Sequence, residues 1–260
     1  MTLPSPEEQP LDQRPLHVRI AADLRDDILN GELGPGAKLP STTHLKARFD
    51  ASSATVQKAL GLLKDERLVI GRAGSAVIVR EHRQRTIRPA DSLSAGASAD
   101  APYPWLTDAA GHGAHAVSRL LEVRETVPPA DVALAMCLEP DDRALLRHQL
   151  LRIDGEPAEL VRSYYPLDIA RGTALAEARR IKGGTPTLLA GLGFPPRLSV
   201  DRVSARIPTQ EEHRSLGLNS DLPVLRTLRT VFSDDRRPVE ATVMVKAGHL
   251  YELRYEFAPD

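Results

Sequence analysis

Apolar residues near the start of the chain recur every fourth position, at Ile20, Leu24 and Ile28. This spacing places the three side chains on one face of a helix, which the pattern predicts over His17–Asn30. Gly31 follows directly and is typical of a helix end. The region therefore reads as the first element of a compact helical domain.

Two shorter helices are predicted next, each preceded by a serine that can accept a hydrogen bond from a free backbone amide. Ser41 is the expected N-cap of a helix over Thr42–Phe49, and Ser52 is the expected N-cap of a helix that ends near Asp65. Two short helices joined by a tight turn, the second capped by a hydroxyl, predict a helix-turn-helix.

A β-hairpin is predicted directly after these helices. Apolar runs at 68–70 and 76–79 flank a Gly-rich, basic segment at 71–75, as in the wing of a winged helix-turn-helix. Arg72 lies at the expected tip, where a guanidinium can enter a minor groove or contact the DNA backbone.

The rest of the chain alternates between predicted strands and short helices. The strands are expected at Val117–Glu125, Leu145–Ile153, Ala158–Tyr165, Ser199–Ile207, Val224–Ser233, Val239–Lys246 and Tyr251–Phe257. The helices are expected at Pro129–Met136, Leu167–Arg179, Pro186–Leu192 and after Thr209, which forms a capping box with Glu212. Asp154-Gly155 predicts a tight hairpin turn. Mostly antiparallel strands with helices beside them indicate the α+β class.

The chain is expected to divide into four parts. Residues 1–13 read as a tail, 14–82 as a winged helix-turn-helix domain, 83–104 as a linker and 105–260 as the α+β domain. The linker prediction rests on an Ala/Ser/Gly-rich composition, which buries too little apolar surface to order itself.

Composition narrows the class of protein. The chain has 260 residues, 42% of them hydrophobic and 27% charged, which suits two soluble domains. No apolar run approaches the roughly 18 residues needed to cross a bilayer, and the N-terminus lacks a secretory pattern, so we expect a cytoplasmic protein. The single cysteine, Cys137, is expected to be a small buried hydrophobe. Neither cysteine nor histidine spacing indicates a metal site, and we expect no cofactor.

The third predicted helix carries the residues best suited to contact DNA. Its expected exposed positions near the N-terminus are Ser52, Ser53, Thr55, Gln57 and Lys58. In a major groove, Gln57 can pair bidentately with adenine and Thr55 can contact a base, a methyl group or a phosphate. Lys38 and Lys58 can neutralise phosphates. Residues 14–85 also hold 13 Lys/Arg against 8 Asp/Glu, whereas 86–260 hold 21 against 24. This local excess of positive charge favours an anionic partner.

Over about residues 14–80 the chain shows the order helix, GELGPGAKLPS, helix, SSATVQKAL, ERLV and GRAGSAVIV. This order resembles the winged helix-turn-helix of the GntR family. The resemblance implies DNA contacts at Ser41, Ser52, Thr55 and the wing around Gly74.

The chain departs from the GntR pattern at three positions where the family usually has arginine. These positions are Thr43, Ser53 and Gln57. Because arginine is the commonest reader of guanine, we expect an operator that depends less on guanine, or weaker binding to each half-site.

Residues 105–257 resemble the UTRA effector-binding domain of the HutC subfamily of GntR regulators. The resemblance is carried, in the family's order, by PPADVALAM, IDGEPAELVRSYYP, GGTPTLLAGLGF, PTQEEHRSLGL, DDRRPVEATVMV and YELRYEF. It implies a chorismate-lyase-like antiparallel sheet with flanking helices, which senses a small molecule and does not catalyse a reaction.

The resemblance also implies a set of effector-binding positions. They are Arg147, Gln149, Leu151, Val161, Thr185, Thr187 and Tyr251. Relatives that bind sugar phosphates have two arginines and a glutamate where this chain has Gln149, Leu151 and Val161. Without two guanidiniums the bidentate grip on a phosphate is lost, so we expect a less charged, more apolar effector. Arg147 and Arg152 lie nearby, so a different strand register would bring an arginine to this site instead. Thr185 as a helix cap and Tyr251 as a core residue are the structural alternatives.

The resulting hypothesis is a repressor that binds an inverted-repeat operator as a homodimer, with one winged helix on each half-site. A small-molecule effector would favour an arrangement of the domains that no longer fits the operator. Two alternatives stay open: a chorismate-lyase-like enzyme, and an interaction module that has lost DNA binding. No G-x-S-x-G, Walker loop or H-E-x-x-H motif supports catalysis.

Overall fold

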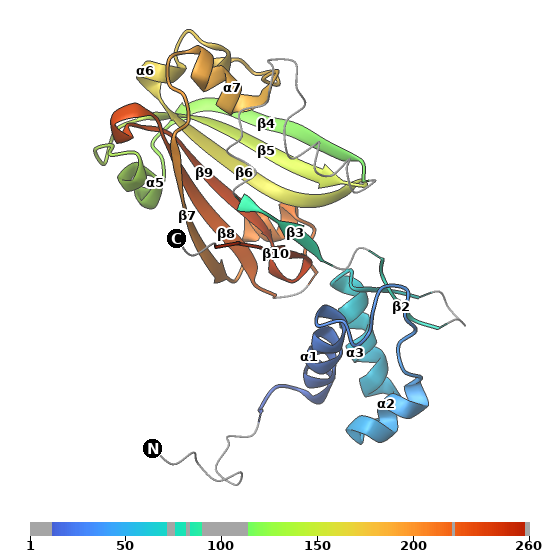
Figure 1. Ribbon diagram of the computed structural model, residues 1–260. Helices are drawn as coiled ribbons and strands as arrows, with labels where there is room; N and C mark the ends of the chain where they lie inside the picture. Colours follow the sequence, from blue (N-terminus) through green and yellow to red (C-terminus); the bar gives the residue numbers. More distant parts are fainter. Residues whose placement is uncertain (1–11, 72–75, 82–83, 90–113, 220–221, 258–260) are drawn as a thin grey trace. The chain divides into compact units, whose positions relative to one another are not determined.

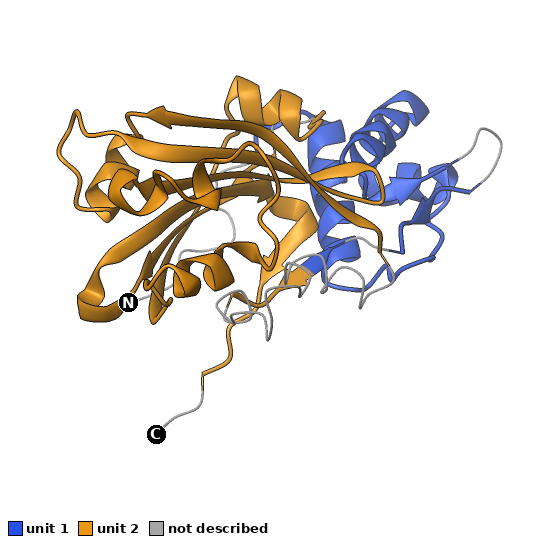
Figure 2. Cartoon of the chain, turned by 90° about the horizontal axis from the view of Figure 1, so that it is seen from above, with its two compact units in different colours: residues 1–85 blue, residues 86–260 orange. Residues whose placement is uncertain are grey.

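The computed structural model describes residues 12–71, 76–81, 84–89, 114–219 and 222–257. The chain forms two compact units, residues 1–85 and residues 86–260, which are coloured blue and orange in Figure 2. The predicted linker, 83–104, is described only over its first part. That part includes a strand, β3 (Arg85–Ile87), so a β-element lies where we expected none.

The N-terminal unit contains the three predicted helices, α1 (Leu16–Leu29), α2 (Thr42–Phe49) and α3 (Ser53–Asp65), as Figure 1 shows. Two short strands, β1 (Val69–Ile70) and β2 (Ile78–Val79), pair antiparallel and confirm the wing hairpin.

The core of this unit confirms the predicted helical faces. The apolar stripe of α1 is fully buried, and so is the inner face of α3. Both serine caps are also present: Ser41 Oγ accepts from the His44 amide at 3.2 Å, and Ser52 Oγ accepts from the Thr55 amide at 3.1 Å. These caps satisfy backbone amides that a helix leaves unpaired at its start.

The C-terminal unit is built on one antiparallel sheet of six strands, in the order β4-β5-β6-β9-β8-β7. The strands are β4 (Ala116–Thr126), β5 (Ala144–Ile153), β6 (Glu156–Pro166), β7 (Leu198–Arg206), β8 (Val224–Phe232) and β9 (Pro238–Ala247). Asp154 and Gly155 both have positive φ, 51° and 80°, as a two-residue hairpin turn requires. The predicted α+β class is confirmed.

Helices cover both faces of this sheet. They are α5 (Ala130–Ala135), α6 (Leu167–Ala170), α7 (Gly184–Gly191) and α8 (Gln210–Ser215), with short 3-10 turns η3 (Ala174–Ala176), η4 (Asp234–Arg236) and η5 (Gly248–Leu250). Side chains from α5 and those just after α8 pack with Leu146 on one face. Side chains from α6 and α7 pack with Leu145 on the other, which we call the inner face. Neighbouring residues of a strand point to opposite faces, so the sheet lies between two apolar layers.

Two predicted elements are wrong in extent. The helix expected over Leu167–Arg179 is broken into α6 and η3, because Gly172 takes a φ of 73° and the Thr173 hydroxyl caps a new turn. The strand expected over Tyr251–Phe257 is only β10 (Tyr251–Leu253), which pairs with the equally short β3.

The prediction that Cys137 is buried is also wrong. Cys137 is exposed and follows the end of α5 with a φ of 56°. The backbone turns away from the sheet here, because the Leu138 amide reaches back to the Ala133 carbonyl at 2.9 Å. Met136, one residue earlier, enters the core in its place.

Candidate functional site

Helix α3 presents a polar surface that no described residue covers. Ser53, Gln57 and Lys58 are exposed, and Thr55 is half-buried beside them. On the opposite side, apolar residues pack against α1 and α2, so the helix cannot turn this polar face inward. The arrangement leaves the N-terminal half of α3 free to enter a groove of DNA.

Two side chains of this polar surface are already oriented by neighbours. The hydroxyls of Ser52 and Thr55 lie 2.9 Å apart, within hydrogen-bonding distance. The Gln57 amide Nε2 donates to the hydroxyl of Thr42 on α2 at 3.2 Å. Thr42 was absent from the predicted set, because its contact with Gln57 depends on how α2 packs against α3.

The structure describes some of the remaining predicted DNA-contact residues and leaves others out. Lys38 and Thr43 are exposed. Ser41 accepts the cap hydrogen bond of α2, which occupies one lone pair of its hydroxyl and leaves its proton available. Arg72 and Gly74 fall outside the described residues.

A buried ion pair fixes α3 against α1. The guanidinium of Arg25 donates to both oxygens of Glu66, at 2.8 and 2.6 Å. The Glu66 side chain is only 2% exposed. A bidentate pair of this kind sets the angle and register between the helices, and therefore the orientation of α3.

The second candidate site is the inner face of the sheet, where the predicted effector residues gather. Gln149 on β5 pairs directly with Val161 on β6, and Leu151 pairs with Glu159. Alternate positions of one strand share a face, so Arg147 joins Gln149 and Leu151 there. Arg152 lies on the other face and donates to the Gly155 carbonyl at 2.7 Å.

Arg147 serves a purpose that the sequence did not indicate. It is buried, and its guanidinium donates to the carbonyls of Leu175, Glu177 and Arg179 at 2.6, 2.8 and 2.7 Å. Burial lowers the pKa of this guanidinium, while the Tyr165 and Glu177 charges oppose that change. Its two terminal nitrogens hold the loop after α6 through these three hydrogen bonds, whereas the buried Nε–H has no hydrogen-bond partner among the described residues.

A hydrogen-bonded cluster lies next to Arg147 on the inner face. The Glu240 carboxylate accepts from Thr242 at 2.6 Å and also from Tyr165 and Thr185. Burial raises the pKa of Glu240, and the hydrogen bonds together with Arg229 only partly offset this effect. Burial likewise raises the pKa of Tyr165, whose side chain is 1% exposed. The cluster is rich in hydroxyls, and its burial makes the carboxyl group harder to ionise than an exposed one.

Two further pairs of charged residues lie on this face. Arg229 donates to both oxygens of Asp201 at 2.7 Å. Lys246 lies 3.1 Å from Glu159, with its ammonium 5.9 Å from the centre of the Tyr251 ring. The inner face therefore combines neutral hydrogen-bonding groups with internally neutralised charges.

The sequence-predicted effector residues other than Arg147 differ in what they contact. Gln149 accepts from Ser118 at 2.7 Å, while Leu151 and Val161 are buried apolar neighbours. Thr185 joins the Glu240 cluster. The Thr187 hydroxyl is buried and has no hydrogen-bond partner among the described residues. Tyr251 packs in a small apolar cluster with Ile153, as the structural alternative expected.

The inner-face residues that sequence reasoning missed are Tyr165, Asp201, Arg229, Glu240, Thr242 and Lys246. They lie on four different strands, β6, β7, β8 and β9, so no local spacing marks them. The alternation of side chains along each strand was the available signal. It shows which residues of one strand share a face, but only the order of the strands shows which residues of different strands lie together.

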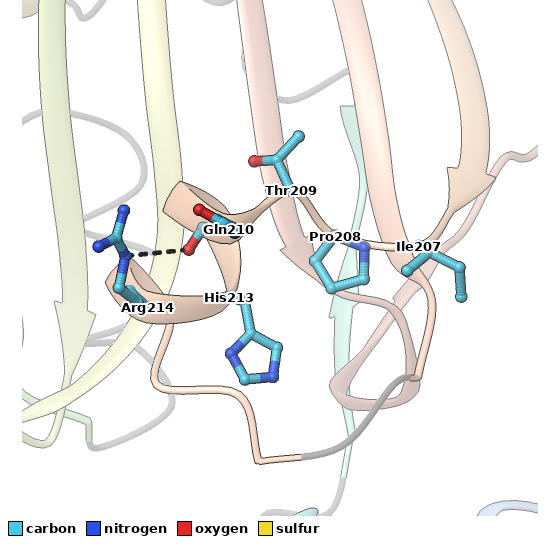
Figure 3. Close-up of a pocket in the computed structure, with 6 residues that line it drawn as sticks. All are labelled: Ile207, Pro208, Thr209, Gln210, His213 and Arg214. Atoms are coloured by element: carbon cyan, nitrogen blue, oxygen red, sulfur yellow. Dashed lines mark hydrogen bonds between the residues drawn. The ribbon is translucent and has the colours of Figure 1, made fainter.

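A shallow pocket of about 430 Å³ lies elsewhere, between the end of β7 and α8. Figure 3 shows its lining, with Ile207 and Pro208 on one side and His213 and Arg214 on the helix. The Arg214 Nε donates to the Gln210 carbonyl at 3.3 Å. One short segment provides every lining residue, so the pocket lacks the converging polar groups of the inner face.

In the part of the chain that the structure describes, no helix is both long and apolar enough to span a membrane.

Two family descriptions match this chain. Residues 16–79 match the bacterial regulatory proteins of the gntR family, and residues 111–252 match the UTRA domain. Together they cover the N-terminal helices with their hairpin and nearly the whole six-stranded sheet.

Individual proteins resemble the chain over different lengths. An uncharacterized HTH-type transcriptional regulator of Streptomyces coelicolor, SCO4628, is 26% identical over 253 residues, covering 93% of this chain and 92% of its own. The mannosyl-D-glycerate transport/metabolism system repressor MngR of Escherichia coli K12 is 37% identical over 70 residues, covering 27% of this chain and 29% of its own.

Among solved structures, PhnF from Mycobacterium smegmatis has a TM-score of 0.55 and 19% identity. The comparison covers 91% of this chain and 99% of PhnF. A second solved structure, a GntR-family transcriptional regulator, has a TM-score of 0.56 and 24% identity over 95% of this chain and 99% of its own. These similarities establish the fold.

Proposed function

The chain belongs to the UTRA domain family and joins this domain to a gntR-family DNA-binding domain, and from this premise we propose that it is a repressor of the HutC subfamily whose operator binding responds to a small molecule. Like its relatives, it is a DNA-binding transcriptional regulator and not an enzyme. The repressor assignment draws on the similarity of a 70-residue part of the chain to the repressor MngR. A bacterial operator places its action in the cytoplasm.

The observation that carries the DNA-binding proposal is the exposed polar surface on the first turns of α3, opposite a buried apolar face. Gln57 is assigned to base contact and Thr55 to a base or phosphate. The other proposed contacts position the domain on the backbone: Lys38, Ser41, Thr43, Ser52, Ser53, Lys58, Arg72 and Gly74.

Selection of bound duplexes from a random library by the full-length protein tests this proposal. We expect an inverted repeat in which the guanine contacts typical of the family are weak. Loss of any sequence preference would favour the second candidate, an interaction module. The observation behind that candidate is the absence of arginine at Thr43, Ser53 and Gln57.

The inner face of the sheet is our proposed effector site. Gln149, Leu151 and Val161 would contact the effector from β5 and β6, and Thr185 and Thr187 from the opposite side. Arg147 acts through the loop it holds, and Tyr251 through its packing with Ile153 and beside the ammonium of Lys246. Because Asp201 and Glu159 already pair with Arg229 and Lys246, and three backbone carbonyls accept from Arg147, the site suits an uncharged ligand with hydroxyl or carbonyl groups better than a phosphate.

A thermal-shift screen of matched pairs tests the effector proposal. Each pair is a sugar or small metabolite and its phosphate ester, tested at equal concentration with the full-length protein. We expect larger shifts from the uncharged members, because a ligand that binds only the folded state stabilises it. Consistently larger shifts from the phosphate esters would overturn the assignment.

Dimerisation completes the proposal. An inverted repeat requires two reading heads related by a two-fold axis, and we assign the contact mainly to the C-terminal units. Light scattering on the full-length protein should give twice the mass of the 28.4 kDa chain. A monomer that still protects both half-sites in footprinting would contradict this arrangement.

A further inference from the structure

The side chain of Gln57 is tethered to the neighbouring helix. Its Nε2 donates to Oγ1 of Thr42, a residue 15 positions earlier in the chain, at 3.2 Å. Gln57 is exposed on α3, whereas Thr42 is half-buried at the first position of α2. An exposed glutamine ordinarily samples several rotamers, and this hydrogen bond selects one of them before any DNA is present.

Thr42 is itself well fixed. It follows Ser41, whose hydroxyl caps α2, and it is a β-branched residue with restricted rotation about its first side-chain bond. Leu45, one turn further along α2, is fully buried. The acceptor that holds Gln57 therefore belongs to a helix that is anchored in the core.

The direction of this hydrogen bond determines which donors and acceptors of the Gln57 amide remain for contact with DNA. A glutamine amide has two N–H donors and one carbonyl acceptor. Thr42 takes one donor, so one N–H and the Oε1 acceptor stay available. One donor beside one acceptor matches adenine, which presents N7 as acceptor and its 6-amino group as donor in the major groove. Guanine presents two acceptors there and does not match this pair.

We propose that Thr42 is a positioning residue that presets Gln57 to read adenine in the operator. The inference rests on the proposed DNA-binding function and adds to it a residue outside the contact set and a structural reason for the choice of adenine. Thr42 contacts no base in this account, and its hydroxyl acts only through the amide of Gln57.

The test uses full-length protein and the operator obtained by selection. The position read by Gln57 is first located as the base pair at which Gln57→Ala loses discrimination, expected to be roughly 5- to 150-fold for a bidentate contact. Affinities of wild type, Thr42→Val and Thr42→Ser are then compared on duplexes with adenine or guanine at that position. Thr42→Val keeps the shape of the side chain and removes the acceptor, whereas Thr42→Ser keeps the acceptor.

We expect Thr42→Val to lose roughly 2- to 10-fold in affinity for the adenine duplex, the cost of ordering a free side chain. Binding to the guanine duplex should stay unchanged, and Thr42→Ser should resemble wild type. Equal melting temperatures of the three proteins would separate this effect from unfolding of α2. Replacing the adenine by 7-deaza-adenine should remove the same discrimination, because it lacks the N7 acceptor.

Two results overturn the inference while leaving the DNA-binding proposal intact. One is a Thr42→Val protein with wild-type discrimination, and the other is a preference for guanine at the Gln57 position. If the wild-type protein selects no duplex at all, the proposed function and this inference both fail.

Discussion

The guanidinium of Arg25 on α1 grips the carboxylate of Glu66 at the C-terminal end of α3 through two hydrogen bonds, at 2.8 and 2.6 Å. Glu66 is nearly inaccessible to solvent, so water compensates little of its charge and the guanidinium of Arg25 contributes to that compensation. The pair joins the first helix of the domain to the helix we assign to DNA. The stability of the N-terminal unit and the orientation of α3 are thereby linked.

Removing one member of this pair should be costly. Arg25→Ala removes the bidentate partner of a buried carboxylate, and we expect a loss on the order of 3 kcal/mol in the free energy of unfolding of the N-terminal unit. Urea unfolding followed by circular dichroism measures it. In a cycle of Arg25→Met, Glu66→Leu and the double variant, the double variant should lose less than the sum of the two single losses. Additive losses would show that the residues act independently.

Arg147 should behave as a structural residue. Arg147→Met deprives the carbonyls of Leu175, Glu177 and Arg179 of their donor, and we expect a cost on the order of 3 kcal/mol in the absence of any ligand. Limited proteolysis should cut the loop after α6 faster. Arg152→Met is the matched control, because Arg152 donates only to an exposed hairpin carbonyl. An Arg147→Met protein as stable as the control would return Arg147 to the list of direct effector contacts.

Glu240 should make stability depend on pH. Burial raises its pKa above the ordinary value of 4.5, so the folded state binds a proton more tightly than the unfolded chain. Its contribution is fully present below pH 4.5 and is lost as the pH rises through the raised pKa. Glu240→Gln should make the free energy of unfolding vary less with pH over this range. The same slope in the variant as in wild type would assign the dependence to other groups.

Glu212 should make stability depend on pH in the opposite direction to Glu240. Burial alone would raise the pKa of Glu212, but hydrogen bonds from Arg206 and Thr209 outweigh it and lower the pKa. Its contribution is therefore present above the ordinary value of 4.5 and disappears as the pH falls through the lowered pKa. Glu212→Gln should reduce the stabilisation near pH 7 and leave stability below the lowered pKa nearly unchanged. An equal loss at pH 7 and at pH 3 would contradict this account.

The N-terminal unit was largely predictable from sequence because its signals are local. The apolar spacing of α1 and the serines before α2 and α3 act within a few residues of one another, and the helix bounds agree within one residue. The tether between Gln57 and Thr42 was out of reach, since it arises from packing between helices.

The C-terminal unit was less predictable in detail. Strand positions followed from alternation, yet the network around Glu240 depends on the order of strands in the sheet. Gly172 could have signalled the break between α6 and η3, but the amphipathic pattern of 167–179 favoured one helix. Cys137 was misplaced because an apolar run does not show where a helix ends and turns outward.

The most direct test of the central claim measures the full-length protein binding to its selected duplex and to the same duplex with its preferred bases replaced. Wild type should bind the selected duplex on the order of 1,000-fold more tightly at physiological salt. Lys58→Ala should weaken both interactions equally, and Gln57→Ala should weaken only the selected one. Equal affinity of wild type for the two duplexes would contradict the claim that α3 reads a DNA sequence.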